Sequence, residues 1–491
     1  MTDQKNQWKT LDKDLRRIGQ LEYATQYVGR PLVGFGVALA FIVLAAAVAA
    51  IFMGWTESGV IVIAAAAFGA YMAINIGAND VANNMGPAVG ANALTLGGAI
   101  VIAAIFESAG ALLAGGDVVA TISTGIIAPD AVGDTRLFVW AMMAALISSA
   151  LWINLATWIG APVSTTHAVV GGVLGAGIVA AGFAAVNWPS IGAIAASWVI
   201  SPVLGGVIAA GFLAFIKSRI IYRDDKIAAA RVWVPVLIGI MMGAFATYLS
   251  IKGLSRVMSI GLMNALLIGL VIGAASYAVS SPIVRRQSRE LENRNRSLKK
   301  LFAIPLVISA ALLSFAHGAN DVANAVGPLA AIVHATQSGD IGASVAIPTW
   351  VMVIGAFGIT FGLVLFGPKL IRMVGSQITK LNPMRAYCVS LSAAITVIVA
   401  SWLGLPVSST HIAVGAVFGV GFFREWDAER RARNNAAKPN SKPRLAPEER
   451  QRRKLVRRSH FMTIIAAWII TVPATAGLSA LVFFGLSTFL A

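Results

Sequence analysis

The chain has 491 residues, of which 57% are hydrophobic and 12% are charged, and its mean hydropathy is +0.78. Soluble domains carry about 25% charged residues, so this composition excludes an ordinary soluble enzyme. The formal net charge of +17 could indicate nucleic-acid binding. However, the Lys and Arg residues cluster in a few loops between apolar stretches, which is typical of a protein oriented in a lipid bilayer and predicts no nucleic-acid partner. With one cysteine, Cys388, no disulfide framework is expected.

Apolar stretches recur along the whole chain and predict an all-α polytopic membrane protein with about 12–13 transmembrane helices. The candidate spans lie at residues 33–53, 59–80, 97–115, 137–159, 162–182, 190–216, 232–251, 257–281, 301–322, 346–366, 384–404, 406–423 and 460–490.

The positive charges predict the orientation of these spans. Of the 38 Lys and Arg residues, 35 fall in the segments 1–32, 217–231, 285–300, 369–385 and 424–458. Because Lys and Arg loops are retained in the cytoplasm, we expect a multi-pass protein of a bacterial inner membrane. Its N-terminus would be cytoplasmic and its C-terminus periplasmic.

The string Gly-Ala-Asn-Asp-Val-Ala-Asn occurs at Gly77–Asn83 and again at Gly318–Asn324. In the predicted orientation the first copy runs inward and the second runs outward, which indicates two inverted-topology repeats. An ionisable residue inside a membrane is costly and indicates a functional site. Its duplication points to a transport site that both repeats share.

These features divide the chain into seven predicted parts. They are a basic cytoplasmic arm (1–32), an extra transmembrane helix (33–58), transport repeat 1 (59–216), a linker with two transmembrane helices and basic loops (217–300), transport repeat 2 (301–423), a basic cytoplasmic loop (424–459) and a C-terminal transmembrane helix (460–491).

A second duplicated segment covers residues 157–167 and 401–411. In both copies a Gly-x-Pro sequence precedes a run of hydroxyl residues, which predicts a broken or re-entrant helix that begins at membrane depth. A helix N-terminus offers unpaired N–H groups and a positive dipole end, and so forms an anion site. The hydroxyl donors are Ser164, Thr165, Thr166, Ser408, Ser409 and Thr410. Hydrogen bonds to the helix backbone are the alternative role for such hydroxyls.

The Asp and Asn side chains of the first motif supply hard oxygen ligands that could coordinate Na⁺ or accept protons. Two symmetric cation sites are expected, at Asn79, Asp80 and Asn83 and at Asn320, Asp321 and Asn324. A structural role as hydrogen-bonded helix caps is the alternative.

Other buried ionisable residues could take part in coupling. Glu107 lies within an apolar span, and His317 precedes the second motif where the first copy has Ile76. Both are candidates for proton coupling. His167 and His411 close the hydroxyl motifs, either as residues that orient the site or as packed polar residues.

The twin Asn-Asp and Pro-Val-Ser motifs resemble those of the inorganic phosphate transporter (Pit) family. The resemblance extends over residues 59–490. It implies a phosphate symporter driven by H⁺ or Na⁺, without a cofactor and often a homodimer, which could also carry phosphate as a divalent metal complex. By motif, phosphate binding falls to the two hydroxyl runs with Asn79 and Asn320. Cation binding falls to Asp80, Asn83, Asp321 and Asn324. Residues 1–58 have no counterpart in the second repeat.

A sulfate permease on the same scaffold is the main alternative. Phosphate can donate a proton to a carboxylate and sulfate cannot, so an Asp facing the anion favours phosphate. A channel or a membrane receptor is a further alternative. Enzymatic activity is not expected, because adjacent, duplicated Thr-His pairs suit binding better than catalysis.

Overall fold

A computed structural model describes residues 33–128, 132–159, 163–253, 260–339, 347–373, 381–436 and 458–489. The predicted basic arm (1–32), Pro162 and most of the basic loop after residue 436 lie outside these residues. Within them, eleven helices are long and apolar enough to cross a membrane. The predicted all-α membrane class is thereby confirmed.

The first part of the chain forms a helix over Val33–Met53, α2 (Glu57–Asn79), α3 (Val81–Gly90), α4 (Leu96–Ala114), α5 (Gly116–Thr124), α7 (Thr135–Ile159), α8 (Thr165–Ala181), η1 (Phe183–Ala185) and α9 (Trp188–Ile216). The middle forms η2 (Lys217–Ile221), α10 (Lys226–Lys252), α11 (Leu262–Gln287) and α12 (Asn295–Leu301). The last part forms α13 (Ala303–Asp321), α14 (Ala323–Ser338), α15 (Thr349–Met373), α16 (Pro383–Trp402), α17 (Ser409–Ala436) and α19 (Arg458–Phe489).

Two predicted spans differ from the structure because they are not full crossings. Segment 162–182 forms α8, which has 17 residues, whereas a helix needs about 20 to span the hydrocarbon core. Segment 406–423 forms only the first half of α17, whose second half is charged. The turn that joins α16 to α17 is buried at Val407 and Ser408. Helices α16 and α17 therefore form a hairpin whose tip lies inside the protein.

Two other spans are longer than predicted. The predicted span 59–80 continues through α3 to Gly90, and the predicted span 301–322 continues through α14 to Ser338. Asp80 keeps helical dihedral angles (φ −88°, ψ −29°) between α2 and α3. The Gly86-Pro87 and Gly327-Pro328 pairs, which follow the two Asn-Asp motifs, therefore lie within the crossings and do not end them.

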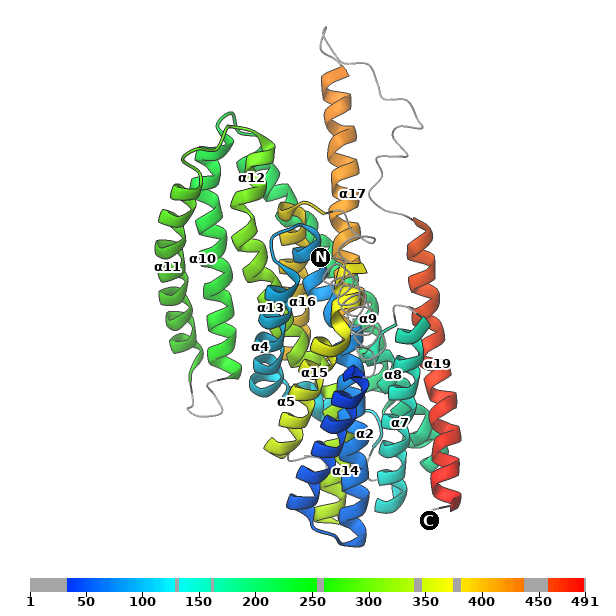
Figure 1. The fold of residues 1–491 in the computed structure, drawn as a ribbon. Helices are drawn as coiled ribbons and strands as arrows, with labels where there is room; N and C mark the ends of the chain where they lie inside the picture. The colour runs from blue at the N-terminus through cyan, green and yellow to red at the C-terminus, as the bar shows by residue number, and fades with distance from the viewer. Residues whose placement is uncertain are drawn as a thin grey trace, which may run out of the picture.

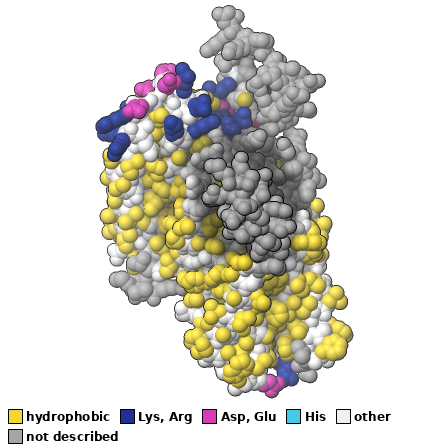
Figure 2. Space-filling model, in the orientation of Figure 1, with side chains coloured by type: hydrophobic (Ala, Val, Ile, Leu, Met, Phe, Trp, Pro, Cys, Tyr) yellow, Lys and Arg dark blue, Asp and Glu magenta, His cyan; other side chains and the backbone are white. Residues whose placement is uncertain are grey.

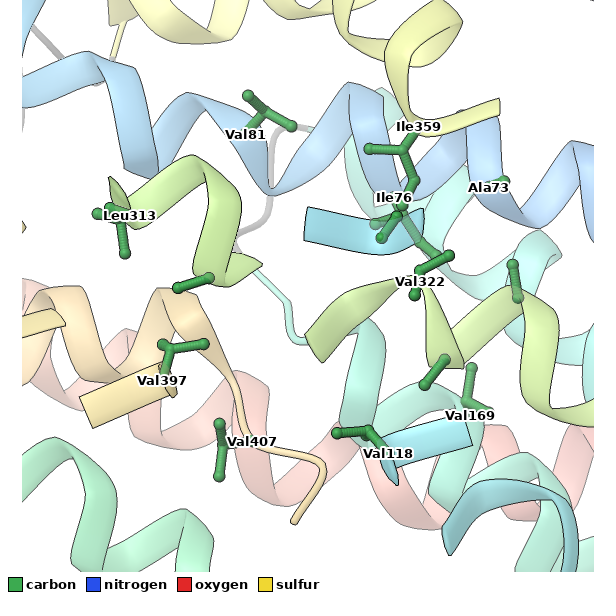
Figure 3. Close-up of a cluster of buried hydrophobic side chains, with 14 of the residues drawn as sticks. Ala73, Ile76, Val81, Val118, Val169, Leu313, Val322, Ile359, Val397 and Val407 are labelled. Carbon is green, nitrogen blue, oxygen red and sulfur yellow. The ribbon is translucent and has the colours of Figure 1, made fainter. Parts of the chain in front are cut away.

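The motif glycines fasten each broken helix to a helix from the other half of the chain. A Cβ on Gly77 of α2 would overlap the backbone oxygen of Ile359 in α15, and one on Gly318 of α13 would overlap that of Glu107 in α4. Only glycine allows such backbone contact. Apolar side chains including Ile76, Val81 and Val322 surround these crossings (Figure 3).

Helices α8 and α17, which each begin at a hydroxyl run, pack in an equivalent way. Gly175 of α8 lies against the backbone of Ala476 in α19, and Gly419 of α17 lies against that of Gly206 in α9. Gly175 and Gly419 occupy equivalent positions in the duplicated segment. Thus α19 covers α8 as α9 covers α17. This equivalence favours a second repeat that includes the C-terminal helix, although the predicted repeat boundaries stay a prediction.

Most of the Lys and Arg side chains on the visible face gather at one end of the molecule, near the upper ends of α10 to α12 (Figures 1 and 2). The C-terminus lies at the opposite end (Figure 1). The basic residues and the C-terminal helix end therefore lie at opposite ends, as expected if the basic loops are cytoplasmic. The orientation of the termini in the membrane stays a prediction.

Substituting Gly419 by Ala tests the close packing of α17 on α9. The added Cβ would overlap the Gly206 backbone, and overpacking of this kind destabilises by about 1–3 kcal/mol. We expect a lower midpoint of thermal unfolding for the detergent-solubilised protein. Gly211→Ala is the matched control, since a Cβ there meets open space and Ala favours a helix. Equal midpoints for the two variants would contradict the packing.

Candidate functional site

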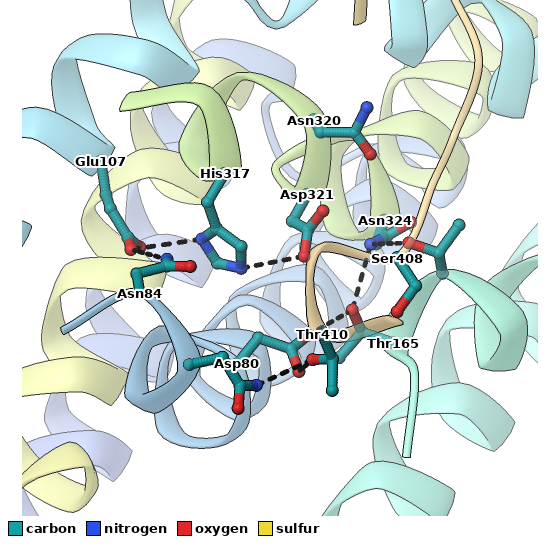
Figure 4. A network of polar contacts seen from close by, with 12 residues as sticks. Asp80, Asn84, Glu107, Thr165, His317, Asn320, Asp321, Asn324, Ser408 and Thr410 are labelled. Atoms are coloured by element: carbon teal, nitrogen blue, oxygen red, sulfur yellow. Dashed lines mark hydrogen bonds and ion pairs between the residues drawn. The ribbon is translucent and has the colours of Figure 1, made fainter. Parts of the chain in front are cut away.

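The junctions between α2 and α3 and between α13 and α14 meet the N-termini of α8 and α17 in one buried polar network (Figure 4). Both helices begin where the hydroxyl runs predict. The Ser164 hydroxyl accepts the His167 N–H (3.2 Å), and the Ser408 hydroxyl accepts the His411 N–H (3.3 Å). These bonds are N-caps. Ser164 and Ser408, two of the predicted site residues, therefore cap the helix ends on which the other hydroxyl residues lie.

Hydroxyl groups from both halves of the chain bind the Asp80 carboxylate. Thr165 donates to Oδ2 (2.7 Å) and Thr410 donates to Oδ1 (3.2 Å). Asn83 in turn donates to the Thr410 hydroxyl (2.8 Å). The first Asn-Asp motif is thus hydrogen-bonded to the N-termini of both α8 and α17.

The second motif makes the reciprocal contact. Asn324 donates to the hydroxyls of Thr165 (3.3 Å) and Thr166 (3.2 Å) in α8. Thr166 then donates to the backbone oxygen of Val407 (3.0 Å), in the turn before α17. Each copy of the motif therefore contacts the hydroxyl run of the opposite half.

The first Asn of each motif holds its own half together. Asn320 donates to Ser401 (3.0 Å) and to the backbone oxygen of Leu405 (3.1 Å), and accepts the Val407 N–H (3.1 Å). Asn79 donates to Thr157 (2.8 Å). Thr157 and Ser401 open the duplicated segment at equivalent positions. They are not among the predicted site residues, although their equivalent positions in the two copies were a signal in the sequence.

The environment of Asp321 is different. Nε2 of His317 lies 2.9 Å from its carboxylate, and Nδ1 of the same ring lies 3.2 Å from Glu107. Asn84 also donates to Glu107 (3.0 Å). All four side chains are buried. The structure therefore joins both candidates for proton coupling to the site and adds Asn84, which stands where the second motif copy has Ala325.

The predicted pair of symmetric cation sites becomes one cluster. Ligand atoms of Asp80, His317 and Asp321 lie within 4.8 Å of one another, and all three residues are buried. Two carboxylates suit a hard cation such as Na⁺ or a proton. The imidazole can join as a ligand only in its neutral form.

Some polar atoms near the cluster have no protein partner among the described residues. They include the buried Ser409 hydroxyl and the side-chain oxygen of Asn324. Buried polar groups are normally hydrogen-bonded. An unpartnered hydroxyl at a helix N-terminus, beside Thr410, therefore marks a position where a ligand could bind.

His167 and His411 lie behind this network. Their ring centroids are 4.6 Å apart, and the His167 ring lies 3.8 Å from that of Trp198. The two histidines therefore pack the first turns of α8 and α17 together.

The profile described as the phosphate transporter family matches residues 76–479. A relative from Helicobacter pylori strain J99, named "Putative phosphate permease", is 44% identical over 96% of this chain and 98% of its own length. A relative with that name from Haemophilus influenzae is 36% identical over 86% of this chain and 96% of its own. A solved structure described as "The sodium-dependent phosphate transporter" matches with a TM-score of 0.78 and 34% identity, over 87% of this chain and 99% of that chain.

Replacing Asn320 by Ala tests the turn between α16 and α17. The change removes three hydrogen bonds and leaves the Val407 N–H unpaired, and each such buried group costs about 1–3 kcal/mol. We expect lower thermal stability and faster hydrogen exchange over residues 403–407. Ser309→Ala is the control, since that hydroxyl bonds only to its own helix. Unchanged exchange in the turn would refute this role of Asn320.

Proposed function

Because the chain belongs to the phosphate transporter family, we propose that it imports inorganic phosphate across the bacterial inner membrane by symport with H⁺ or Na⁺. The observation that carries this proposal is the meeting of two helix N-termini and their hydroxyls with a buried carboxylate cluster. The comparisons point to a transporter and give no support to a sulfate permease. A homodimer with a cytoplasmic N-terminus completes the proposal.

Phosphate would bind between the N-termini of α8 and α17. The hydroxyls of Thr165 and Thr410 now donate to Asp80 and could turn to donate to the anion, joined by Ser409. Hydrogen bonds from helix N-termini and hydroxyls can hold an anion without a buried Lys or Arg. Phosphate carries a proton that it can donate to a carboxylate such as Asp80, and sulfate does not.

The carboxylates supply a physical reason for cation coupling. Asp80, Glu107 and Asp321 share one buried network with the imidazole of His317. A phosphate ion would add further negative charge. Unpaired charges in a low-dielectric site cost several kcal/mol each, so phosphate requires protons or metal cations to enter with it. We assign this role to Asp80 and Asp321, with Asn83 and Asn324 orienting the hydroxyls beside them.

The remaining predicted residues take supporting roles in this proposal. The amides of Asn79 and Asn320 already bond within their own halves, and we assign them to positioning the hydroxyl runs. Glu107 and His317 would exchange a coupling proton with Asp321. A divalent metal that travels with phosphate would neutralise charge in the same way.

Ser409→Ala tests the phosphate site without removing a hydrogen bond inside the protein. If Ser409 donates to phosphate, its loss removes a hydrogen bond to a charged group. Such a bond contributes about 1.5–3 kcal/mol, so KM for uptake should rise roughly 10- to 100-fold. Thermal stability should stay unchanged. Ser390→Ala is the matched control, because that hydroxyl is also buried and unpartnered but lies in the interior of α16. An unchanged KM in Ser409→Ala would refute the assignment.

The coupling ion is tested in proteoliposomes that carry an inward H⁺ gradient or an inward Na⁺ gradient, with and without Mg²⁺. We expect one gradient to drive phosphate accumulation in the wild type. Asp80→Asn and Asp321→Asn should abolish accumulation, because each removes a carboxylate from the cluster. Normal accumulation by both variants would refute the coupling role. Uptake of sulfate in place of phosphate would refute the substrate.

A further inference from the structure

A long apolar groove runs between α9, α17 and α19, and His167 and His411 are among its lining residues. Its volume is about 1380 Å³. Apolar side chains line it, among them Val199, Val203, Phe418, Phe422, Ile469 and Pro473. Several of these, such as Val203 (63% exposed) and Ile469 (68% exposed), have much of their surface uncovered. The groove therefore opens sideways, toward the lipid of a surrounding bilayer.

The dimensions of the groove match one leaflet. Along α17 it extends from His411, beside the site, to Trp426 in the charged half of the helix. Fifteen residues of α-helix rise about 22 Å, which exceeds half of the roughly 30 Å hydrocarbon core. The groove thus extends from the interior of the membrane to the headgroup region on the basic side.

Positive charge surrounds the outer end of the groove. Arg430 follows Trp426 by one helical turn, and its guanidinium carbon lies 5.2 Å from the Trp426 ring centroid. The nearby acid Asp427 is paired with Lys217 (2.8 Å) and Arg431 (3.5 Å). Residues 217–219 and 424–433 contain six Lys and Arg residues but only three Asp and Glu residues. An anion is therefore favoured at this end.

We propose that this groove holds one acyl chain of an anionic phospholipid, with the lipid phosphate at Arg430. Basic pockets at the cytoplasmic ends of transmembrane helices suit such headgroups, and Trp426 suits the interface. The inner end of the chain would contact the rings of His167 and His411, in the first turns of α8 and α17. If the proposed transport site is correct, lipid binding would also affect transport. The lipid site itself does not depend on that function.

Lipid retention by the full-length protein, measured by native mass spectrometry, tests the proposal. The probes are phosphatidylglycerol and phosphatidylcholine with identical acyl chains. We expect one retained phosphatidylglycerol, bound about five- to tenfold more tightly than phosphatidylcholine, since each basic residue near the headgroup favours an anionic lipid. Arg430→Gln should remove this preference, and the control Arg286→Gln, in α11, should keep it.

Filling the groove provides the second arm. Val203→Trp, or Val207→Trp if the first variant does not fold, should abolish retention. The matched control is Val279→Trp, at an equally exposed position of α11 outside the groove. Retention in both groove variants, or equal binding of the two lipids by the wild type, would overturn the proposal. Conversion of a dimer to a monomer by Val203→Trp, with lipid still bound, would assign the groove to a second copy of the chain.

Discussion

Backbone groups freed where helices break have no water to bind inside a bilayer, so this fold depends on side chains that replace the water. The turn between α16 and α17 shows how this is done. Gly404 adopts a positive φ of 67°, and its backbone oxygen accepts a hydrogen bond from Thr121 of α5 (2.7 Å). Val407 is held at its N–H by Asn320 and at its oxygen by Thr166. Most of these partners come from another part of the chain, so the helix breaks are stable only in the complete fold.

The same dependence links the two halves of the chain to each other. Glycine contacts place α2 on α15 and α13 on α4, so that each broken helix lies against a helix from the other half. The site is then built from hydrogen bonds that cross between the halves, such as that from Asn83 to Thr410. The hydroxyls that stabilise Asp80 are also the donors that an anion would require. A movement of one half against the other would therefore change the proposed binding site directly.

Sequence alone predicts the elements that carry the site, because duplicated motifs mark equivalent positions without any alignment. It overestimates the crossings for a physical reason. A hairpin that enters the membrane and returns has the same apolar composition as two spans, and it leaves all later loops on the same sides. The positive charges therefore cannot distinguish the two. The Gly-x-Pro and hydroxyl runs indicate a re-entrant helix, and the short α8 and the buried tip at Val407 agree with it. Sequence also could not show that Asp80 and Asp321 lie in one cluster, because that depends on how the two halves pack.

The differences between the halves converge on one carboxylate. His317 and Asn84 stand where the opposite motif copy has Ile76 and Ala325, and both contact Glu107. Gly318 packs on Glu107 as Gly77 packs on Ile359, so the counterpart of Glu107 is an isoleucine. Figure 3 shows the apolar contact of one half, with Ile76 near Ile359. Figure 4 shows the equivalent polar contact of the other half, with Glu107 near His317. Because apolar residues occupy the equivalent positions in the other half, the repeated architecture itself does not call for these polar residues. The polar set places an imidazole in direct contact with Asp321 (2.9 Å), whereas the carboxylate of Asp80 accepts hydrogen bonds from Thr165 and Thr410, so the two aspartates have different surroundings.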